Sequence, residues 1–127
     1  NSLFTQREKK TMSVIIFHNP RCSKSRETLK LLEEQQIHPQ VELYLEKRYS
    51  VAQLQEIAQK LGINHVREMM RTKDELYREL DLDNPKLSEL QLLEAIAQHS
   101  ALLERPIVIN GDKAKIGRPP ESVLAIL

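Results

Sequence analysis

Apolar positions in the first third of the chain predict a strand, a helix and a second strand. Residues 13–17 (SVIIF) form a short apolar, β-branched run that is typical of a buried strand. The polar turn HNPRCSKSR follows, and Pro20 disfavours helix at the residue before it. Helical spacing of apolar residues then starts after Ser23 and ends near Gln36. The alternation in residues 41–45 (VELYL) predicts a second strand.

The middle of the chain predicts a block of helices. Ser50 and Ser88 each stand three residues before a glutamine, which is the capping-box pattern for a helix start. Gly62 is placed to end the first of these helices. Shorter helical pieces are expected at residues 66–71 and 73–80. The apolar positions expected to face inward are Val51, Leu54, Ile57, Ala58 and Leu61 in the first helix, and Leu90, Leu93, Ile96 and Ala97 in the second.

The last part of the chain predicts a hairpin and a helix. Residues 107–109 (IVI) form a β-branched run, and the Asn-Gly-Asp turn at residues 110–112 predicts a hairpin to a partner strand at 114–116. After Pro119 and Pro120 a final helix is expected, with Val123, Leu124 and Leu127 buried.

The order of these elements predicts an α/β fold of the thioredoxin-like kind. A βαβ half followed by a ββα half gives a mixed sheet of about four strands, here with a central helical insertion. Residues 12–127 are expected to form a single domain. Residues 1–11 have no hydrophobic periodicity, and Met12 resembles a natural start. We therefore interpret residues 1–11 as an added extension or a disordered tail.

Composition narrows the possible functions. Without residues 1–11, which hold three basic and one acidic residue, the chain has 16 basic and 17 acidic residues, so bulk charge predicts no nucleic-acid partner. Aromatic residues make up only 4% of the chain, too few for a single-strand stacking platform. No apolar stretch is long enough to predict a membrane span. A single cysteine favours a reducing, cytoplasmic location.

Cys22 stands where the first predicted strand has ended and the first helix begins. A helix N-terminus presents unpaired backbone N–H groups and a partial positive charge, and both favour the nucleophilic thiolate. The alternative is that Cys22 is a small buried apolar residue, which is the commonest fate of a free cysteine. The surrounding cations and hydroxyl groups favour a pocket for a tetrahedral oxyanion instead. These neighbours are Arg21, Ser23, Lys24, Ser25 and Arg26.

The position where a second redox cysteine would stand holds Ser25. After Cys22 attacks a substrate, the chain has no thiol of its own to resolve the product. The chemistry therefore predicts an external thiol, such as glutathione or glutaredoxin.

The sequence HNPRCSKSR resembles the glutaredoxin-coupled arsenate reductases and their close relatives. The resemblance continues through LYLE, LGI, EMMR, ERPIVI and GRPPESVLAIL, in the same order and over nearly all of residues 13–127. It implies a thioredoxin-like fold with a helical insertion. It also implies reduction of arsenate to arsenite, with glutathione as co-substrate, glutaredoxin as partner and no bound cofactor.

The resemblance also assigns roles to individual residues. Cys22 matches the nucleophile that forms a thiol–arsenate adduct, and Arg71, Arg105 and Arg118 match three arginines that bind and polarise arsenate. His18 matches a histidine that influences the thiol. Guanidinium groups suit this task because they stay charged and offer paired donors to oxyanions. The other residues expected to bind substrate are Ser23, Lys24, Ser25 and Arg26, and Pro106 is expected to be in cis.

Three of these residues could instead have purely structural roles. Arg71 could cap a helix C-terminus, and Arg118 could be a solvated loop residue. His18 could be structural. The other histidines, His38, His65 and His99, do not share a metal-ligand spacing with Cys22, so no metal site is predicted.

Two further functions stay open. Arg21 and Lys24 add positive charge where the resembled enzymes tend to have small residues, which could favour another anionic substrate. A glutathione-linked oxidoreductase of protein mixed disulfides would suit the one-cysteine motif. A redox-sensing regulator that binds RNA polymerase shares the fold, but its switch needs a cysteine pair and this chain has one cysteine.

Overall fold

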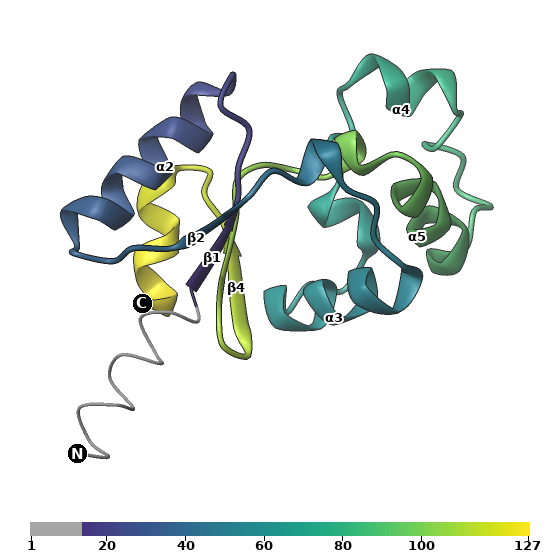
Figure 1. The fold of residues 1–127 in the computed structure, drawn as a ribbon. Coiled ribbons are helices and arrows are strands. Elements are labelled where there is room, and N and C mark those ends of the chain that lie inside the picture. Colours follow the sequence, from purple (N-terminus) through teal and green to yellow (C-terminus); the bar gives the residue numbers. More distant parts are fainter. Residues whose placement is uncertain (1–13) are drawn as a thin grey trace. The chain divides into compact units, whose positions relative to one another are not determined.

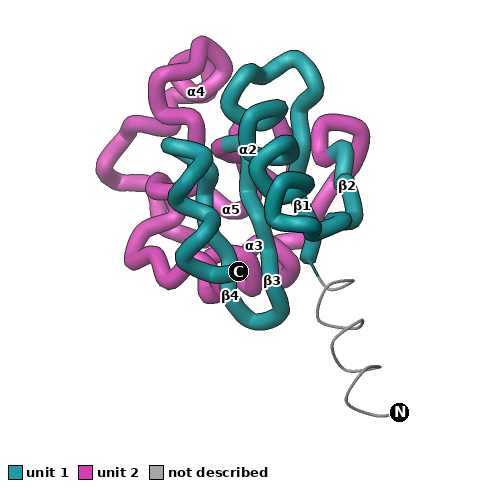
Figure 2. Tube along the Cα trace, turned by 90° about the vertical axis from the view of Figure 1, so that its left-hand side faces the viewer, with its two compact units in different colours: residues 1–43, 105–127 teal, residues 44–104 magenta. Residues whose placement is uncertain are grey.

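The computed structural model describes residues 14–127, so the prediction for residues 1–11 lies outside the described part. The chain divides into two compact units, coloured separately in Figure 2. Unit 1 combines the N-terminal part up to Leu43 with residues 105–127, and unit 2 is the segment between them, Tyr44–Glu104. None of the described helices is long and apolar enough to cross a membrane.

Unit 1 is built on a four-stranded mixed sheet, which confirms the predicted fold class. Its strands are β1 (Val14–Phe17), β2 (Gln40–Glu42), β3 (Ile107–Asn110) and β4 (Lys113–Ile116). The spatial order is β2-β1-β3-β4. β1 pairs in parallel with β2 and antiparallel with β3, and β3 forms the predicted hairpin with β4. Helix α2 (Ser23–Glu34) makes the crossover that a parallel pair needs.

One face of this sheet is covered by α2 and by the 3₁₀ helix η4 (Pro120–Ile126), which lie side by side (Figure 1). Alternate residues of β1 point toward them because side chains in a strand alternate between faces. Burial of such side chains contributes about 1.5–3 kcal/mol each and fixes α2 against the sheet. The buried cluster consists of Val14, Ile16, Leu32, Val108 and Val123.

Two predictions in unit 1 are wrong at the ends of elements. The second strand was expected to reach residue 45, but it ends at Glu42 and is followed by the 3₁₀ helix η1 (Tyr44–Glu46). The reason is the length of its partner: Glu42 pairs with Phe17, the last residue of β1. Beyond that point the chain of β1 turns away, so β2 has no strand left to pair with.

The predicted burial of two residues in the final helix is wrong. This helix is a 3₁₀ helix with three residues per turn, so residues 120, 123 and 126 align on one face. Val123 is fully buried as predicted, whereas Leu124 and Leu127 are 42% and 38% exposed. Their burial had been predicted from α-helical spacing.

Unit 2 is helical and contains the predicted insertion. Its two longest helices are α3 (Val51–Leu61) and α5 (Glu89–Gln98), and both begin with the predicted capping boxes. Gly62 ends α3 with a left-handed φ of 69°. The prediction for Leu90 is wrong, because it is 53% exposed and the buried face of α5 is formed by Leu92, Leu93 and Ile96.

The remaining elements of unit 2 are short. The helical pieces expected at 66–71 and 73–80 are η2 (Val66–Met69), a 3₁₀ helix, and α4 (Glu75–Glu79), and η3 (Ser100–Leu102) follows α5. Arg67 holds the loop after α4: its guanidinium donates to the Tyr77 hydroxyl and to backbone carbonyls of Leu82 and Asn84.

Candidate active site

Cys22 occupies the N-cap position of α2, as the sequence predicted. Its backbone is extended (φ −94°, ψ 124°), its N–H donates to the Asn19 carbonyl at 3.0 Å, and its own carbonyl accepts from Arg26 N–H. The side chain is a free thiol of intermediate exposure. The strand-to-helix turn therefore presents the sulfur to solvent at the positive end of the helix dipole.

The pKa of the Cys22 thiol lies below its ordinary value. Burial is the largest single influence and raises the pKa, because it disfavours the charged thiolate. The backbone N–H groups of Ser25 and Lys24 and the guanidinium groups of Arg105 and Arg118 lower it, and together they outweigh burial. These two N–H groups lie in the first turn of α2 and favour the thiolate, although the Cys22 side chain makes no regular capping hydrogen bond.

The Arg118 guanidinium reaches the sulfur directly. One guanidinium nitrogen lies 3.7 Å from Cys22 Sγ, and Nε donates to the Arg105 carbonyl at 2.9 Å. This second bond fixes the direction of the planar guanidinium group, so the side chain is held toward the thiol although it is exposed.

Arg105 and Arg118 lie on two segments that are bonded to each other. Each arginine precedes a proline in cis, which confirms the expectation for Pro106 and adds Pro119. The Gly117 N–H donates to the Pro106 carbonyl at 2.9 Å, one residue away from the bond between the two arginines. Both arginines thus belong to one pair of turns that hydrogen bonds hold together.

Gly117 is needed where these turns meet α2. A Cβ built on it would lie 2.6 Å from Thr28 Oγ1 and 2.9 Å from Pro106 Cγ, closer than real contacts allow. Thr28 is fully buried and its hydroxyl donates to the Lys24 carbonyl in the first turn of α2. The missing side chain lets the segment of Arg118 approach the helix that carries Cys22.

His18 and Ser25 form a buried pair beneath the loop. His18 Nδ1 lies 2.6 Å from Ser25 Oγ, and this hydroxyl oxygen also accepts from the Asn19 N–H. Burial, and then the nearby Arg26 charge, lower the pKa of His18, so the ring is neutral near pH 7. The Ser25 hydroxyl is fully buried and bonded to the loop, so what Ser25 offers the thiol is its backbone N–H.

Two of the cations near Cys22 in the sequence, Lys24 and Arg26, have partners other than the thiol. Lys24 Nζ lies 3.7 Å from a carboxylate oxygen of Glu27, and the Arg26 guanidinium donates to the Pro20 carbonyl at 2.9 Å. Neither side-chain charge contributes to the shift of the thiol pKa. Ser23 is exposed at the first position of α2. Binding of substrate by these three side chains stays a prediction.

Arg71, the third predicted arginine, belongs to unit 2. Its N–H donates to the Leu102 carbonyl at 2.8 Å, beside an isolated β-bridge between Met70 and Leu103. Its guanidinium group pairs with Asp74 at 3.2 Å. The backbone around Arg71 is therefore fixed by its own unit, and the assigned role in binding arsenate stays a prediction.

Comparison with known proteins identifies the family of this chain. The ArsC family matches residues 17–126 of the chain. The chain belongs to the ArsC family. An arsenate reductase of Haemophilus influenzae is 72% identical over 91% of this chain and all of its own length. A second one, from Escherichia coli, is 40% identical over 91% of this chain and 81% of that protein.

A solved ArsC structure agrees with the fold. The arsenate reductase of Vibrio cholerae is 58% identical and superposes with a TM-score of 0.89, covering 91% of this chain and 98% of that one. This likeness supports the thioredoxin-like plan for the ArsC chain.

The sequence had missed three features of this ArsC site: the bond between the two arginine turns, the close approach at Gly117 and the His18–Ser25 pair. A glycine directly before Arg118 was a signal for close backbone approach, since glycine tolerates contacts that a Cβ would block. The buried pairing of His18 with Ser25 left no such signal. Within residues 14–127 no group of His, Cys, Asp or Glu side chains could hold a metal ion.

Proposed function

We propose that this protein reduces arsenate to arsenite through a covalent adduct on Cys22. The membership of the ArsC family and the arsenate reductases named among its relatives support the reaction. The observation that carries the proposal is the Arg118 guanidinium 3.7 Å from a thiol whose pKa is lowered. A thiolate is the attacking form, and the same guanidinium groups suit a doubly charged oxyanion.

In the first step the Cys22 thiolate attacks arsenic and an S–As bond forms. An arsenic-bound hydroxyl takes a proton and leaves as water. Arg105 and Arg118 stabilise the negative charge on the remaining oxygens, and the bond from Arg118 Nε to the Arg105 carbonyl orients the Arg118 guanidinium before substrate arrives. Such preorganised donors lower the barrier because they need no rearrangement during the reaction. By the family resemblance, Arg71 is the third arginine that binds arsenate.

In the second step a glutathione thiolate attacks the Cys22 sulfur. An S–S bond forms, the S–As bond breaks, and its electron pair stays on arsenic, which leaves as arsenite. Glutaredoxin then attacks the glutathione sulfur of the mixed disulfide and releases the Cys22 thiolate. The two electrons that reduce arsenic come from the Cys22 and glutathione thiols. Because the chain has one cysteine, an external thiol, that of glutaredoxin, must restore Cys22. This need for glutathione supports a cytoplasmic location.

The test is arsenite release by purified protein with arsenate, glutathione and glutaredoxin. We expect turnover that needs all three, and a Cys22→Ser variant at the background rate. Turnover by Cys22→Ser equal to the unchanged protein would remove the adduct from the mechanism.

The lone thiol with Ser25 also supports a second candidate, exchange with protein mixed disulfides. Rates on arsenate and on a glutathionylated peptide separate the two. Faster turnover of the peptide, with no arsenite formed from arsenate, would favour the exchange reaction.

A further inference from the structure

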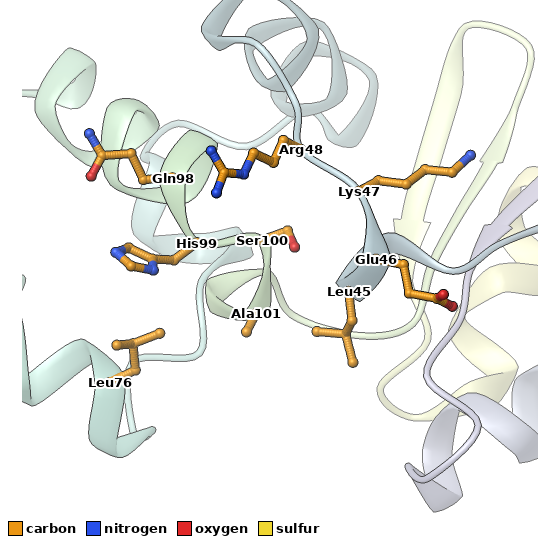
Figure 3. A pocket seen from close by; sticks show the side chains of 9 residues that line it. All are labelled: Leu45, Glu46, Lys47, Arg48, Leu76, Gln98, His99, Ser100 and Ala101. Atoms are coloured by element: carbon orange, nitrogen blue, oxygen red, sulfur yellow. The ribbon is translucent and has the colours of Figure 1, made fainter.

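Unit 2 contains a cavity of about 300 Å³ that the proposed reaction does not use. It is formed by two segments of the unit, residues 45–48 and 98–101, together with Leu76 (Figure 3). Ligand cavities for small molecules start at about this size. The cavity is lined by a polar group and an apolar group of side chains, and both constrain what it can hold.

The polar lining residues are Glu46, Lys47, Arg48, Gln98, His99 and Ser100. The proposed site uses the last four, which we call the polar group. In Figure 3 the Arg48 side chain extends toward Gln98 and His99, while Glu46 and Lys47 extend away from them. Arg48 is exposed, and among residues 14–127 its guanidinium, which offers five donors, has no hydrogen-bond or ion-pair partner. Ser100 is only 9% exposed, and within the same described residues its hydroxyl has no partner either.

The apolar group lies along the other side of the same cavity. It consists of Leu45, Leu76 and Ala101, drawn below the polar group in Figure 3. Leu45 is 46% exposed, so its side chain still has apolar surface to cover. Covering such surface is favourable at about 25 cal/mol per Å². An occupant that meets both groups must therefore be charged or polar at one end and aliphatic at the other.

We propose that this cavity is a second ligand site, which takes a small carboxylate on a short aliphatic chain. The fork of the Arg48 guanidinium matches the two oxygens of a planar carboxylate, and the Ser100 hydroxyl can donate to the same group. The aliphatic chain then lies on Leu45 and Leu76. A cationic ligand fits less well, because the Arg48 guanidinium occupies the polar side of the cavity, whereas the Glu46 carboxylate extends away from it.

The test is a titration of ¹⁵N-labelled full-length protein with butyrate, followed by NMR. We expect saturable shifts of the backbone amides at residues 98–101, with a dissociation constant on the order of 1–10 mM for so small a ligand. Butylammonium has the same chain with the opposite charge and should produce no saturable shifts. Sulfate, which lacks the chain, should bind at least several-fold more weakly than butyrate.

Variants separate this site from the Cys22 site. Arg48→Gln is expected to weaken butyrate about tenfold or more, and Ser100→Ala should weaken it less. Arg78→Gln, which changes an exposed arginine of the same unit, and Cys22→Ser should bind butyrate like the unchanged protein. The proposal is overturned if butyrate gives no saturable shifts at 98–101, if butylammonium or sulfate binds equally well, or if Arg48→Gln binds butyrate undiminished. Normal butyrate binding by Cys22→Ser would show that the cavity site does not depend on the reaction proposed at Cys22.

Discussion

The loop around Cys22 and the turns at Arg105 and Arg118 both lower the pKa of the thiol, but by different means. Lys24 and Arg26 are close to Cys22 in the sequence, yet their side chains bind Glu27 and the Pro20 carbonyl. Arg118 is 96 positions away and its guanidinium lies 3.7 Å from the sulfur. The local loop supplies backbone dipoles, and the distant turns supply side-chain charge.

Helix geometry explains the difference. In the first turn of α2 the backbone N–H groups point along the axis toward the N-cap, whereas side chains radiate outward from it. The Lys24 and Arg26 side chains leave the surface of α2 and reach Glu27 and the Pro20 carbonyl. Charge near the thiol must come from elements that approach from outside the helix, and Gly117 makes room for that approach.

The largest expected effect comes from removing the distant charges. Arg118→Gln and Arg105→Gln should each lower the rate of arsenate reduction about 10²-fold, because a preorganised donor to the developing charge is lost. Lys24→Gln and Arg26→Gln should lower the rate of arsenate reduction about threefold or less, since exposed charges are screened by salt. Steady-state rates of the four variants measure this. Equal losses in both pairs would erase the distinction between the two regions.

Gly117→Ala tests the approach of the turns to α2. The added Cβ would collide with Thr28 and Pro106, and such overpacking costs about 1–3 kcal/mol in the free energy of unfolding. The displaced Arg118 should also make Cys22 less reactive. Denaturant unfolding and the alkylation rate of the thiol measure both effects.

Gly111→Ala is the matched control. Gly111 has a φ of 64° but open space around it, so its alanine variant should lose about 1 kcal/mol of stability. The reactivity of the thiol should not change. If both alanine variants slow alkylation equally, the contact at Gly117 has no special connection with Arg118.

Ser25→Ala removes a hydroxyl but keeps the backbone N–H that faces the sulfur. The buried partners His18 Nδ1 and Asn19 N–H lose their hydrogen bonds, which costs about 1–3 kcal/mol. Thiol reactivity should fall less than in Arg118→Gln. Ser23→Ala, at an exposed position, is the control for stability and should stay within about 0.5 kcal/mol of the unchanged protein.

The smallest effect concerns pH. Because burial and Arg26 lower the pKa of His18, the unfolded chain binds more protons than the folded protein below the ordinary histidine value of about 6.5. The stability that depends on neutral His18 is present above that pH and is lost as pH falls toward the lowered pKa. His18→Gln should flatten this slope in unfolding titrations, and exposed His38→Gln should leave it unchanged.

The sequence predicted those features that depend on local pattern. Capping boxes, the Asn-Gly hairpin and the strand before Cys22 are short-range signals, and the structure has them all. The second strand and the final helix were wrong at their ends, because the length of β1 and a 3₁₀ period decide them. Local charge also suggested that Lys24 and Arg26 act on the thiol, which their bonds to Glu27 and Pro20 do not support.

The distant arginines entered from the family resemblance and not from local pattern. No periodicity in the chain could show that Arg118 donates to the Arg105 carbonyl or that His18 meets Ser25. Such contacts depend on tertiary packing, which brings residues together regardless of their separation in sequence.

The most direct measurement is the pH dependence of Cys22 alkylation by iodoacetamide, a neutral reagent that reports the thiolate. The unchanged protein should reach half its maximal rate below the free-cysteine value of about 8.5. Arg118→Gln should move that midpoint to higher pH, and Lys24→Gln should leave it in place. Two results would contradict the account: a midpoint at or above the free-cysteine value, or a midpoint that shifts in Lys24→Gln and stays unchanged in Arg118→Gln.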